Sequence, residues 1–327
     1  MDFSQIIGHD NIIKLLKNSI KSNRVNHSYI FNGSKGMGKL SLAKAFAKTL
    51  NCHKGGLEPC NECISCKTFE ENNNPDIIYI QHKTSIISVD DIREQIIKNI
   101  SLKPFINKYK IFIIADAHKM NEAAQNAFLK SLEEPPDYSI FLILSENINN
   151  LLITILSRCI TINLNPLPYN LIADYLVHSQ GLSNEQGYIY SKYSMGSIGK
   201  AIELISSSTF NDVRDNAIEI AHKLESADMI DMYNIIESIK DDRATLDTTL
   251  EIIYMIYRDV LVLLKTKSKD KLIQTDKFFI INEIAKTASI SQLIRRCDCI
   301  EFTRDKLRNN GNSYLLLETL FFNIKEK

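Results

Sequence analysis

The chain has 327 residues, 24% charged and 44% hydrophobic, which is typical of a globular protein of two or three domains and excludes a disordered or fibrous one. It carries 39 Lys and Arg against 39 Asp and Glu, so one large basic face for gripping nucleic acid is not expected. Only 11 Gly and 7 Pro are present, about half the average content, which argues against an all-β sandwich or barrel and favours helices.

The first half of the chain alternates short apolar runs with longer helical patterns. Each run has four or five residues, too short for a helix, and is continuously apolar, as in strands of a parallel sheet buried on both faces. We therefore predict a doubly wound α/β domain with a parallel five-stranded sheet. The predicted strands are SYIF (28–31), IIYI (77–80), KIFII (110–114), IFLIL (140–144) and ITIN (160–163).

Helical patterns lie between these strands and dominate the chain after NPLP (165–168). We predict an α/β domain over 1–166, a small helical lid over 167–207 and an all-α C-terminal domain over 208–327. The predicted helices cover 40–52, 89–100, 121–134, 169–180, 196–205, 246–265 and 314–324.

A phosphate-binding loop is predicted directly after the first strand. The segment GSKGMGKL (33–40) matches G-x-x-x-x-G-K through Gly33, Gly38 and Lys39, with a further glycine at Gly36. Glycines let backbone N–H groups curl around phosphate oxygens, and the lysine reaches the same oxygens at a helix N-terminus. The alternative is a glycine-rich turn without a ligand.

Two residue types that hydrolysis of a nucleotide requires are missing from this pattern. Leu40 stands where a Ser or Thr hydroxyl would ligate Mg²⁺, and Ser41 is about 100° further around the helix. The strand that ends in Asp116 is followed by Ala117, which cannot act as a general base. Asp116 is either a metal-binding remnant or a cap of the following loop.

Four cysteines follow the pattern C-x7-C-x2-C-x2-C within an insert at 52–66: Cys52, Cys60, Cys63 and Cys66. Four thiolates without an open position are typical of a structural tetrahedral Zn²⁺ site. A redox dithiol is the alternative. Cys159, Cys297 and Cys299 do not fit the pattern and are expected to be buried thiols.

The chain opens MDFSQIIGHDN, without an apolar leader, and contains no apolar run of about 18 residues. We therefore expect a cytoplasmic protein without a membrane partner, whose cysteines remain reduced unless they bind a metal.

Several segments together resemble the clamp-loader subunits of bacterial DNA polymerase III, which belong to the AAA+ class. The resemblance runs along the whole chain, and its most specific parts are the last two of these segments. In chain order they are IIGHDNIIKLLKNSI, HSYIFNGSKGMGK, the four-cysteine insert, the strand with Asp116, AFLKSLEEPP (127–136) and ILSRC (155–159).

Within this family the chain is most similar to the delta-prime type. The resemblance implies that Arg158 of the SRC motif is an arginine finger, which reaches into the nucleotide site of a neighbouring subunit; the alternative is an interface salt bridge. ATP-hydrolysing tau/gamma subunits have Thr after the loop lysine, a Glu after the strand Asp and GSxR in the lid. This chain has Leu40, Ala117 and GSIG (196–199) at those places.

The resemblance implies a non-hydrolysing subunit of a hetero-pentamer with tau/gamma and delta subunits, in which the C-terminal helices form a collar. Such a complex loads the sliding clamp onto primed DNA in the cytoplasmic replisome. ATP or ADP would contact Gly33, Gly36, Gly38, Lys39 and Asp116 without being hydrolysed. The alternatives are an active tau/gamma-type motor and, from another class, a zinc-dependent nucleic-acid-binding module.

Overall fold

The computed structural model describes residues 2–82, 84–240, 243–309 and 311–325. The chain divides into two compact units, Met1–Glu203 and Leu204–Lys327. The domain boundaries near 166 and 207 stay predictions, and the first of them falls inside the first unit.

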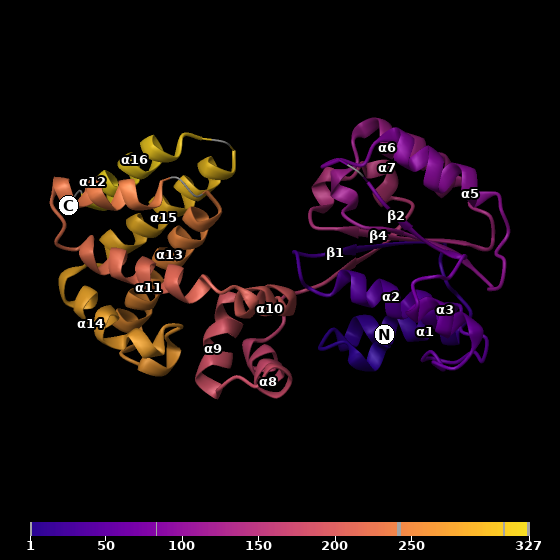
Figure 1. The fold of residues 1–327 in the computed structure, drawn as a ribbon, viewed down its shortest axis with the longest axis horizontal. Coiled ribbons are helices and arrows are strands. Elements are labelled where there is room, and N and C mark those ends of the chain that lie inside the picture. Colours follow the sequence, from indigo (N-terminus) through magenta and orange to yellow (C-terminus); the bar gives the residue numbers. More distant parts are fainter. Residues whose placement is uncertain (1, 83, 241–242, 310, 326–327) are drawn as a thin grey trace. The chain divides into compact units, whose positions relative to one another are not determined.

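A parallel five-stranded sheet forms the centre of the first unit (Figure 1). Its strand order is β2-β3-β4-β1-β5, and every neighbouring pair is parallel. The predicted parallel sheet is confirmed, and the apolar runs of β1, β3 and β4 are buried between the two helix layers, whereas the edge strand β5 is buried only at Ile162, contrary to the expectation of strands buried on both faces. The strands are β1 (Ser28–Asn32), β2 (Ile77–Ile80), β3 (Lys110–Ile114), β4 (Ser139–Ser145) and β5 (Ile160–Asn163).

Helices cover both faces of the sheet. Figure 1 shows α1, α2 and α3 on one face and α5, α6 and α7 on the other. Each layer encloses its own apolar core, one built around Phe46 of α2 and the other around Phe128 of α6. The bounds are η1 (Phe3–Gln5), α1 (Asp10–Lys21), α2 (Lys39–Leu50), α3 (Ile64–Glu70), η3 (Ala117–Lys119), α6 (Glu122–Glu133), η4 (Ile148–Asn150) and α7 (Ile153–Leu156).

The helix predicted over 89–100 is interrupted by a π-helical turn, which the sequence did not indicate. It runs as α4 (Val89–Ile92), the π turn η2 (Arg93–Ile97) and α5 (Lys98–Ile100). Within the wide turn, the Gln95 side-chain amide accepts from the Gln81 N–H at 2.8 Å and donates to the Gln81 carbonyl at 2.6 Å. These two bonds satisfy the backbone just beyond the edge strand β2.

Three short helices follow β5, and the start of the third contacts the loop between β1 and α2. They are α8 (Tyr169–Gln180), α9 (Asn184–Tyr193) and α10 (Ile198–Ser206). Gly199 N–H donates to the Gly36 carbonyl at 3.0 Å, and Ser197 Oγ donates to the Lys35 carbonyl at 2.9 Å. The two backbones approach this closely because both Gly36 and Gly199 lack a Cβ.

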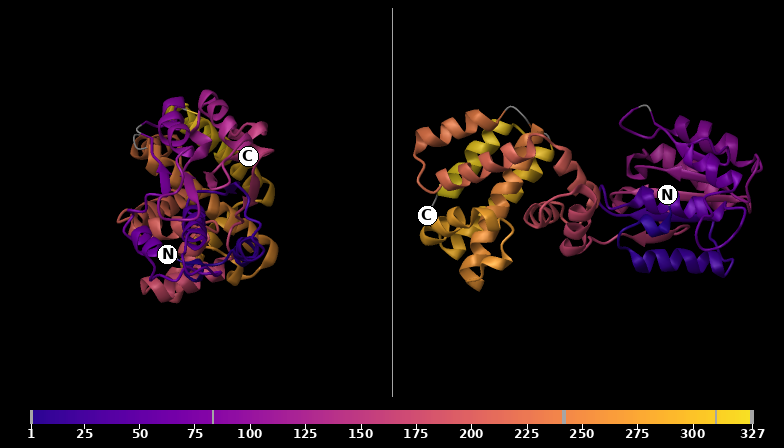
Figure 2. Two further views of the ribbon diagram at one scale, coloured as in Figure 1. Left: turned by 90° about the vertical axis from the view of Figure 1, so that its right-hand side faces the viewer. Right: turned by 60° about the horizontal axis from the view of Figure 1, so that its bottom comes forward.

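The second unit contains only helices among its described residues, as predicted. Its longest helix, α13, packs against α11, α14 and α15, and α15 packs against α16 (Figure 2, orange and yellow). Among the described residues, no helix combines the length and apolar character needed to cross a bilayer. The bounds are α11 (Phe210–Lys223), α12 (Met229–Ile239), α13 (Arg243–Thr266), η5 (Lys269–Lys271), η6 (Thr275–Lys277), α14 (Phe278–Thr287), α15 (Ile290–Arg308) and α16 (Ser313–Lys325).

The close approach of the two glycines can be tested with Gly36→Ala. Gly36 has φ +77°, and a Cβ there would lie 2.5 Å from Ser197 Oγ and 2.9 Å from Lys200 N. The control is Gly38→Ala, because Gly38 has φ +88° but nothing within 4 Å of a Cβ. Both variants incur left-handed strain of about 1–2 kcal/mol, and the first also incurs overpacking of about 1–3 kcal/mol.

We expect Gly36→Ala to lower the thermal unfolding temperature of the first unit more than Gly38→Ala does, measured by calorimetry. Equal shifts for the two variants would show that the lid backbone does not pack on the loop.

Candidate functional site

The phosphate loop links the carboxyl end of β1 to the N-terminus of α2. Gly36 and Gly38 adopt the left-handed backbone conformation that L-residues with a Cβ avoid, and Gly38 is the N-cap residue of α2. The loop therefore has the curled backbone that presents N–H groups to an anion.

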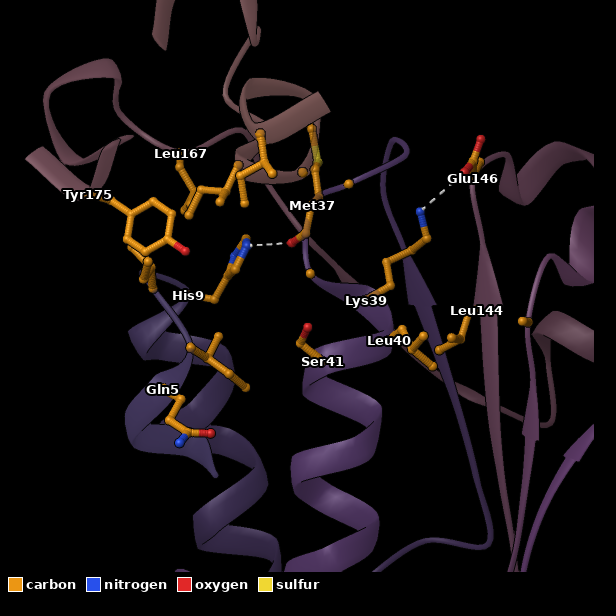
Figure 3. A pocket seen from close by; sticks show the side chains of 18 of the residues that line it. Gln5, His9, Met37, Lys39, Leu40, Ser41, Leu144, Glu146, Leu167 and Tyr175 are labelled. Carbon is orange, nitrogen blue, oxygen red and sulfur yellow. Dashed lines mark hydrogen bonds and ion pairs between the residues drawn. The ribbon is translucent and has the colours of Figure 1, made fainter. Parts of the chain in front are cut away.

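Lys39 is folded back onto its own loop. Its ammonium group donates to the carbonyls of Gly33 at 2.6 Å and Ser34 at 2.9 Å, and lies 3.8 Å from Glu146 Oε1 (Figure 3). Burial lowers the Lys39 pKa, and the negative charges of Glu146 and Asp116 oppose that shift. A phosphate ligand would have to compete with these two carbonyls for the lysine.

The side chains that follow the lysine offer no metal-binding hydroxyl beside it. Leu40 points an apolar, partly exposed side chain into the cavity. Ser41 lies on the His9 side of the first helical turn, away from Lys39 and Glu146 (Figure 3). Ala117, at the position where a general base is expected, is fully buried.

Asp116 follows β3 and lines the same cavity as Lys39. Its backbone is left-handed, with φ +50°, and it begins the turn η3. Its carboxylate accepts a 2.9 Å bond from Lys119 Nζ, and this bond is the main reason that its pKa is lowered. The carboxylate thus reaches the site but is paired with a lysine of its own turn.

A cavity of about 490 Å³ lies between the phosphate loop, the N-terminal segment and the lid helices. His9 separates its two ends, with Nε2 3.1 Å from the Met37 carbonyl (Figure 3). Burial lowers the His9 pKa, which favours the neutral ring. The cavity lining combines a few charged side chains with a larger apolar set; the charged ones are Lys39, Asp116 and Glu146, and the apolar ones include Ile6, Ile7, Leu40, Leu144, Leu167 and Ile202.

Arg158 lies far from this cavity along the sheet. Its carbonyl accepts a 2.7 Å bond from Ser28 Oγ at the first residue of β1, whereas the phosphate loop follows the last residue, Asn32. Four strand steps separate these ends by about 13 Å. Arg158 therefore sits at the edge of the sheet opposite its own phosphate loop.

The Arg158 guanidinium is held by side chains and backbone of its own chain. Nη2 lies 2.8 Å from Glu133 Oε1, and Nη1 donates to the Thr154 carbonyl at 2.9 Å and to Ser157 Oγ at 3.3 Å. About a third of the side chain is exposed. Nothing in the spacing of the sequence indicated the pair with Glu133, because the two residues are 25 positions apart.

The four cysteines of the insert come together as predicted from their spacing. Their sulfur atoms all lie within 4.8 Å of one another. Cys52 follows α2, Cys63 is the N-cap of α3, and Cys66 lies in the first turn of that helix. Four sulfurs at this separation can surround one tetrahedral metal ion.

Backbone N–H groups already point at two of these sulfurs. Cys60 N–H donates to Cys52 Sγ at 3.3 Å, and Cys63 N–H donates to Cys60 Sγ at 3.3 Å. Backbone N–H groups of Glu62 and Cys63 lower the Cys60 pKa to about 6, whereas burial raises the Cys66 pKa to about 12. The backbone of the insert thus favours the thiolate form at Cys60, and the buried Cys66 needs a cation to ionise.

The other cysteines lie outside the cluster. Cys297 is buried, as expected, while Cys159 and Cys299 are only partly buried. Burial raises the Cys159 pKa to about 11 and the Cys297 pKa to about 12, so both thiols are protonated at neutral pH.

Comparison with known proteins shows two kinds of relatives. The chain is 30% identical over 319 residues to the DNA polymerase III subunit delta' of Bacillus subtilis, covering 96% of this chain and 95% of that protein. It is 40% identical over 177 residues to the subunit tau/gamma of Haemophilus influenzae, covering 54% of this chain and 25% of that protein. The chain thus spans about a quarter of the tau/gamma subunit and nearly all of the delta' subunit.

Two solved structures show a more distant similarity. The Bacillus subtilis DNA clamp loader delta protein is 12% identical, with a TM-score of 0.36 over 96% of this chain and 100% of that one. The Thermotoga maritima RuvB Holliday junction branch migration motor is 17% identical, with a TM-score of 0.45 over 86% of this chain and 88% of that one.

A sequence profile of the family described as "DNA polymerase III, delta subunit" matches residues 8–168, which contain the phosphate loop, the cysteine cluster and Arg158. Together with the end-to-end similarity to the Bacillus subtilis subunit, this match shows that the chain belongs to the clamp-loader subunit family of DNA polymerase III.

Proposed function

We propose that this chain is a delta-prime-type clamp-loader subunit, which hydrolyses no ATP itself and supplies Arg158 to the ATP site of a neighbouring subunit. The observation that carries the proposal is a phosphate loop with Leu40 and Ala117 in place of metal ligand and base, combined with an Arg158 held at the opposite edge of the sheet.

The side chains around Lys39 support the absence of hydrolysis. A positioned general base contributes about 10²–10⁴-fold in rate, and an Ala117 methyl group cannot accept a proton. Without a hydroxyl at Leu40, Mg²⁺ loses the protein ligand that positions it between the phosphates. Both losses act on the same reaction, so neither compensates for the other.

The position of Arg158 supports action on another molecule. The length of β1, about 13 Å, separates Arg158 from the start of its own phosphate loop. The guanidinium therefore cannot reach a phosphate bound at that loop. It is partly exposed and can therefore meet a nucleotide held by a second chain. An arginine supplied in this way neutralises charge that develops on the transferred phosphoryl group.

The relatives favour the delta-prime type over a motor. The delta' subunit aligns along almost its entire length, whereas the tau subunit of Bacillus subtilis, 33% identical, aligns over 36% of its length. The partners proposed on this basis are tau/gamma and delta subunits, a sliding clamp, and primed DNA bound by the whole complex. This role places the chain in the cytoplasm, at the replisome.

The cavity beside the loop fits a nucleotide that is bound without being hydrolysed. Gly33, Gly36, Gly38 and Lys39 would hold its phosphates, and Asp116 would lie beside them. A bound nucleotide would supply the anionic oxygens that release Lys39 from the carbonyls of its own loop.

Zinc is the metal proposed for the cysteine cluster. Four thiolates and no open position suit a structural Zn²⁺ ion, which would join the end of α2 to α3.

The first prediction from the proposed function concerns ATP turnover by the isolated chain. Because metal ligand and base are both replaced, we expect the purified protein to release phosphate from ATP no faster than a Lys39→Ala variant does, in a phosphate-release assay. Turnover that Lys39→Ala abolishes would instead favour a tau/gamma-type motor.

The second prediction concerns Arg158 in a loader reconstituted from this chain with tau/gamma and delta subunits. We expect Arg158→Ala to reduce DNA-stimulated ATP turnover at the neighbouring site on the order of 10³-fold, the lower range for arginine fingers. Arg93→Ala removes an exposed arginine of the π turn and should leave turnover unchanged. Unchanged turnover with Arg158→Ala would refute the role assigned to it.

The third prediction concerns the metal. We expect about one zinc per chain by elemental analysis, its loss in Cys63→Ser, and a lower thermal unfolding temperature in that variant. Cys299→Ser, which changes a cysteine outside the cluster, should retain the zinc. A metal-free protein with unchanged thermal stability would contradict the assignment.

Salt-dependent DNA binding by the isolated chain that chelation abolishes would favour a zinc-dependent nucleic-acid-binding module.

A further inference from the structure

The surroundings of Arg158 use only part of its hydrogen-bonding capacity. A guanidinium has five N–H donors. Nη1 donates to the Thr154 carbonyl and Ser157 Oγ, and Nη2 gives one hydrogen to Glu133. Among the described residues, the Nε–H and the second Nη2 hydrogen have no partner. The contacts therefore hold the guanidinium while leaving two donors for an oxyanion from outside.

Glu133 occupies a helix position that is unfavourable for a carboxylate. It is the last residue of α6, and Glu134 follows as the C-cap. The carboxyl end of a helix carries partial negative charge, so an acidic side chain there is destabilising unless a cation lies close by. Arg158 supplies that cation, with its Nη2 2.8 Å from Glu133 Oε1.

The backbone around Arg158 is also anchored. Ser28 Oγ, which is nearly fully buried, donates to the Arg158 carbonyl at 2.7 Å, and Arg158 N–H donates to the Ile155 carbonyl at 3.1 Å. With the backbone held in this way, the remaining freedom of the residue lies in its side-chain torsions. An unrestrained arginine has many rotamers and loses side-chain entropy when it is immobilised.

We propose that Glu133 is a positioning residue for the arginine finger: it stays paired with Arg158 and aims the two free N–H donors at the phosphoryl group of a nucleotide bound by the neighbouring subunit. The proposal rests on the function assigned to Arg158 above. Glu133 itself does not touch the nucleotide; it restricts the rotamers of the residue that does.

The expected loss of ATP turnover in Glu133 variants can be estimated from the solvent exposure of the Glu133–Arg158 ion pair. The two side chains are 34% and 49% exposed, so solvent screens their attraction and the pair stabilises the fold by less than about 1 kcal/mol. A restraint of that size corresponds to a change in rate of at most about fivefold. Glu133 variants should therefore fold normally and show a moderate loss, smaller than that of Arg158→Ala.

The test is a double-mutant cycle in the reconstituted loader, with ATP turnover measured at saturating DNA and saturating concentration of this subunit. We expect Glu133→Ala to lower kcat by a factor of about two to five without changing KM for ATP, and Glu133→Gln, which keeps an acceptor but no charge, to lower it less. Glu134→Ala, the neighbouring exposed carboxylate, is the matched control and should match the unmodified protein. The Glu133→Ala, Arg158→Ala double variant should be no slower than Arg158→Ala alone.

The outcomes separate this proposal from the function on which it rests. If Arg158→Ala itself has no effect, the arginine-finger role fails. If Arg158→Ala is slow but Glu133→Ala turns over at the unmodified rate, only the positioning role fails. An additive loss in the double variant, or a loss that higher subunit concentration restores, would assign Glu133 to the subunit contact and overturn the proposal.

Discussion

The parallel pairing of β1 with β4 on one side and β5 on the other is the constraint on which both candidate sites depend. Parallel strands bring all their carboxyl ends to one edge of the sheet, so the phosphate loop after β1, Asp116 after β3 and Glu146 after β4 meet around one cavity. The same pairing brings the amino ends to the opposite edge, where Arg158 precedes β5 and Ser28 begins β1. One sheet thus separates the candidate nucleotide-binding cavity from the proposed arginine finger, Arg158.

The charged side chains at the carboxyl ends of the strands differ from Arg158 at the amino ends in how far their hydrogen bonds are already satisfied. At the carboxyl edge, Lys39 is satisfied by the carbonyls of its own loop and Asp116 by Lys119, so both groups have partners without a ligand. At the amino edge, Arg158 donates three hydrogen bonds within the described part of the chain and has two further N–H groups without a partner there. An intramolecular partner has to be displaced at the first edge, whereas free donors are already present at the second. This difference is consistent with the proposed subunit, which would hydrolyse no nucleotide at its own loop.

Much of the fold could be predicted because the decisive signals are local. Continuous β-branched runs mark buried parallel strands, and the spacing of Cys52, Cys60, Cys63 and Cys66 is enough to bring four sulfurs together over two short turns. The π turn around Gln95 was missed because the contact that accompanies it is non-local: Gln95 pairs with the backbone of Gln81, fourteen residues away and just beyond the edge strand β2. The contact of Gly199 with Gly36 was missed for the same reason. The two residues are 163 positions apart, and neither sequence motif contains a signal that it packs against the other.

The sequence by itself determined which chemical groups the chain possesses: a loop lysine, no hydroxyl or base beside it, four clustered cysteines and an arginine in an SRC motif. Side-chain identity determines which reactions are chemically possible, and no fold can make the methyl group of Ala117 act as a general base. Only the tertiary structure decided where these groups lie relative to one another. The distance between Arg158 and its own loop, and the pairing of Arg158 with Glu133, arise from strand order and from where α6 ends. These are non-local consequences of packing, which residue types and their spacing do not encode.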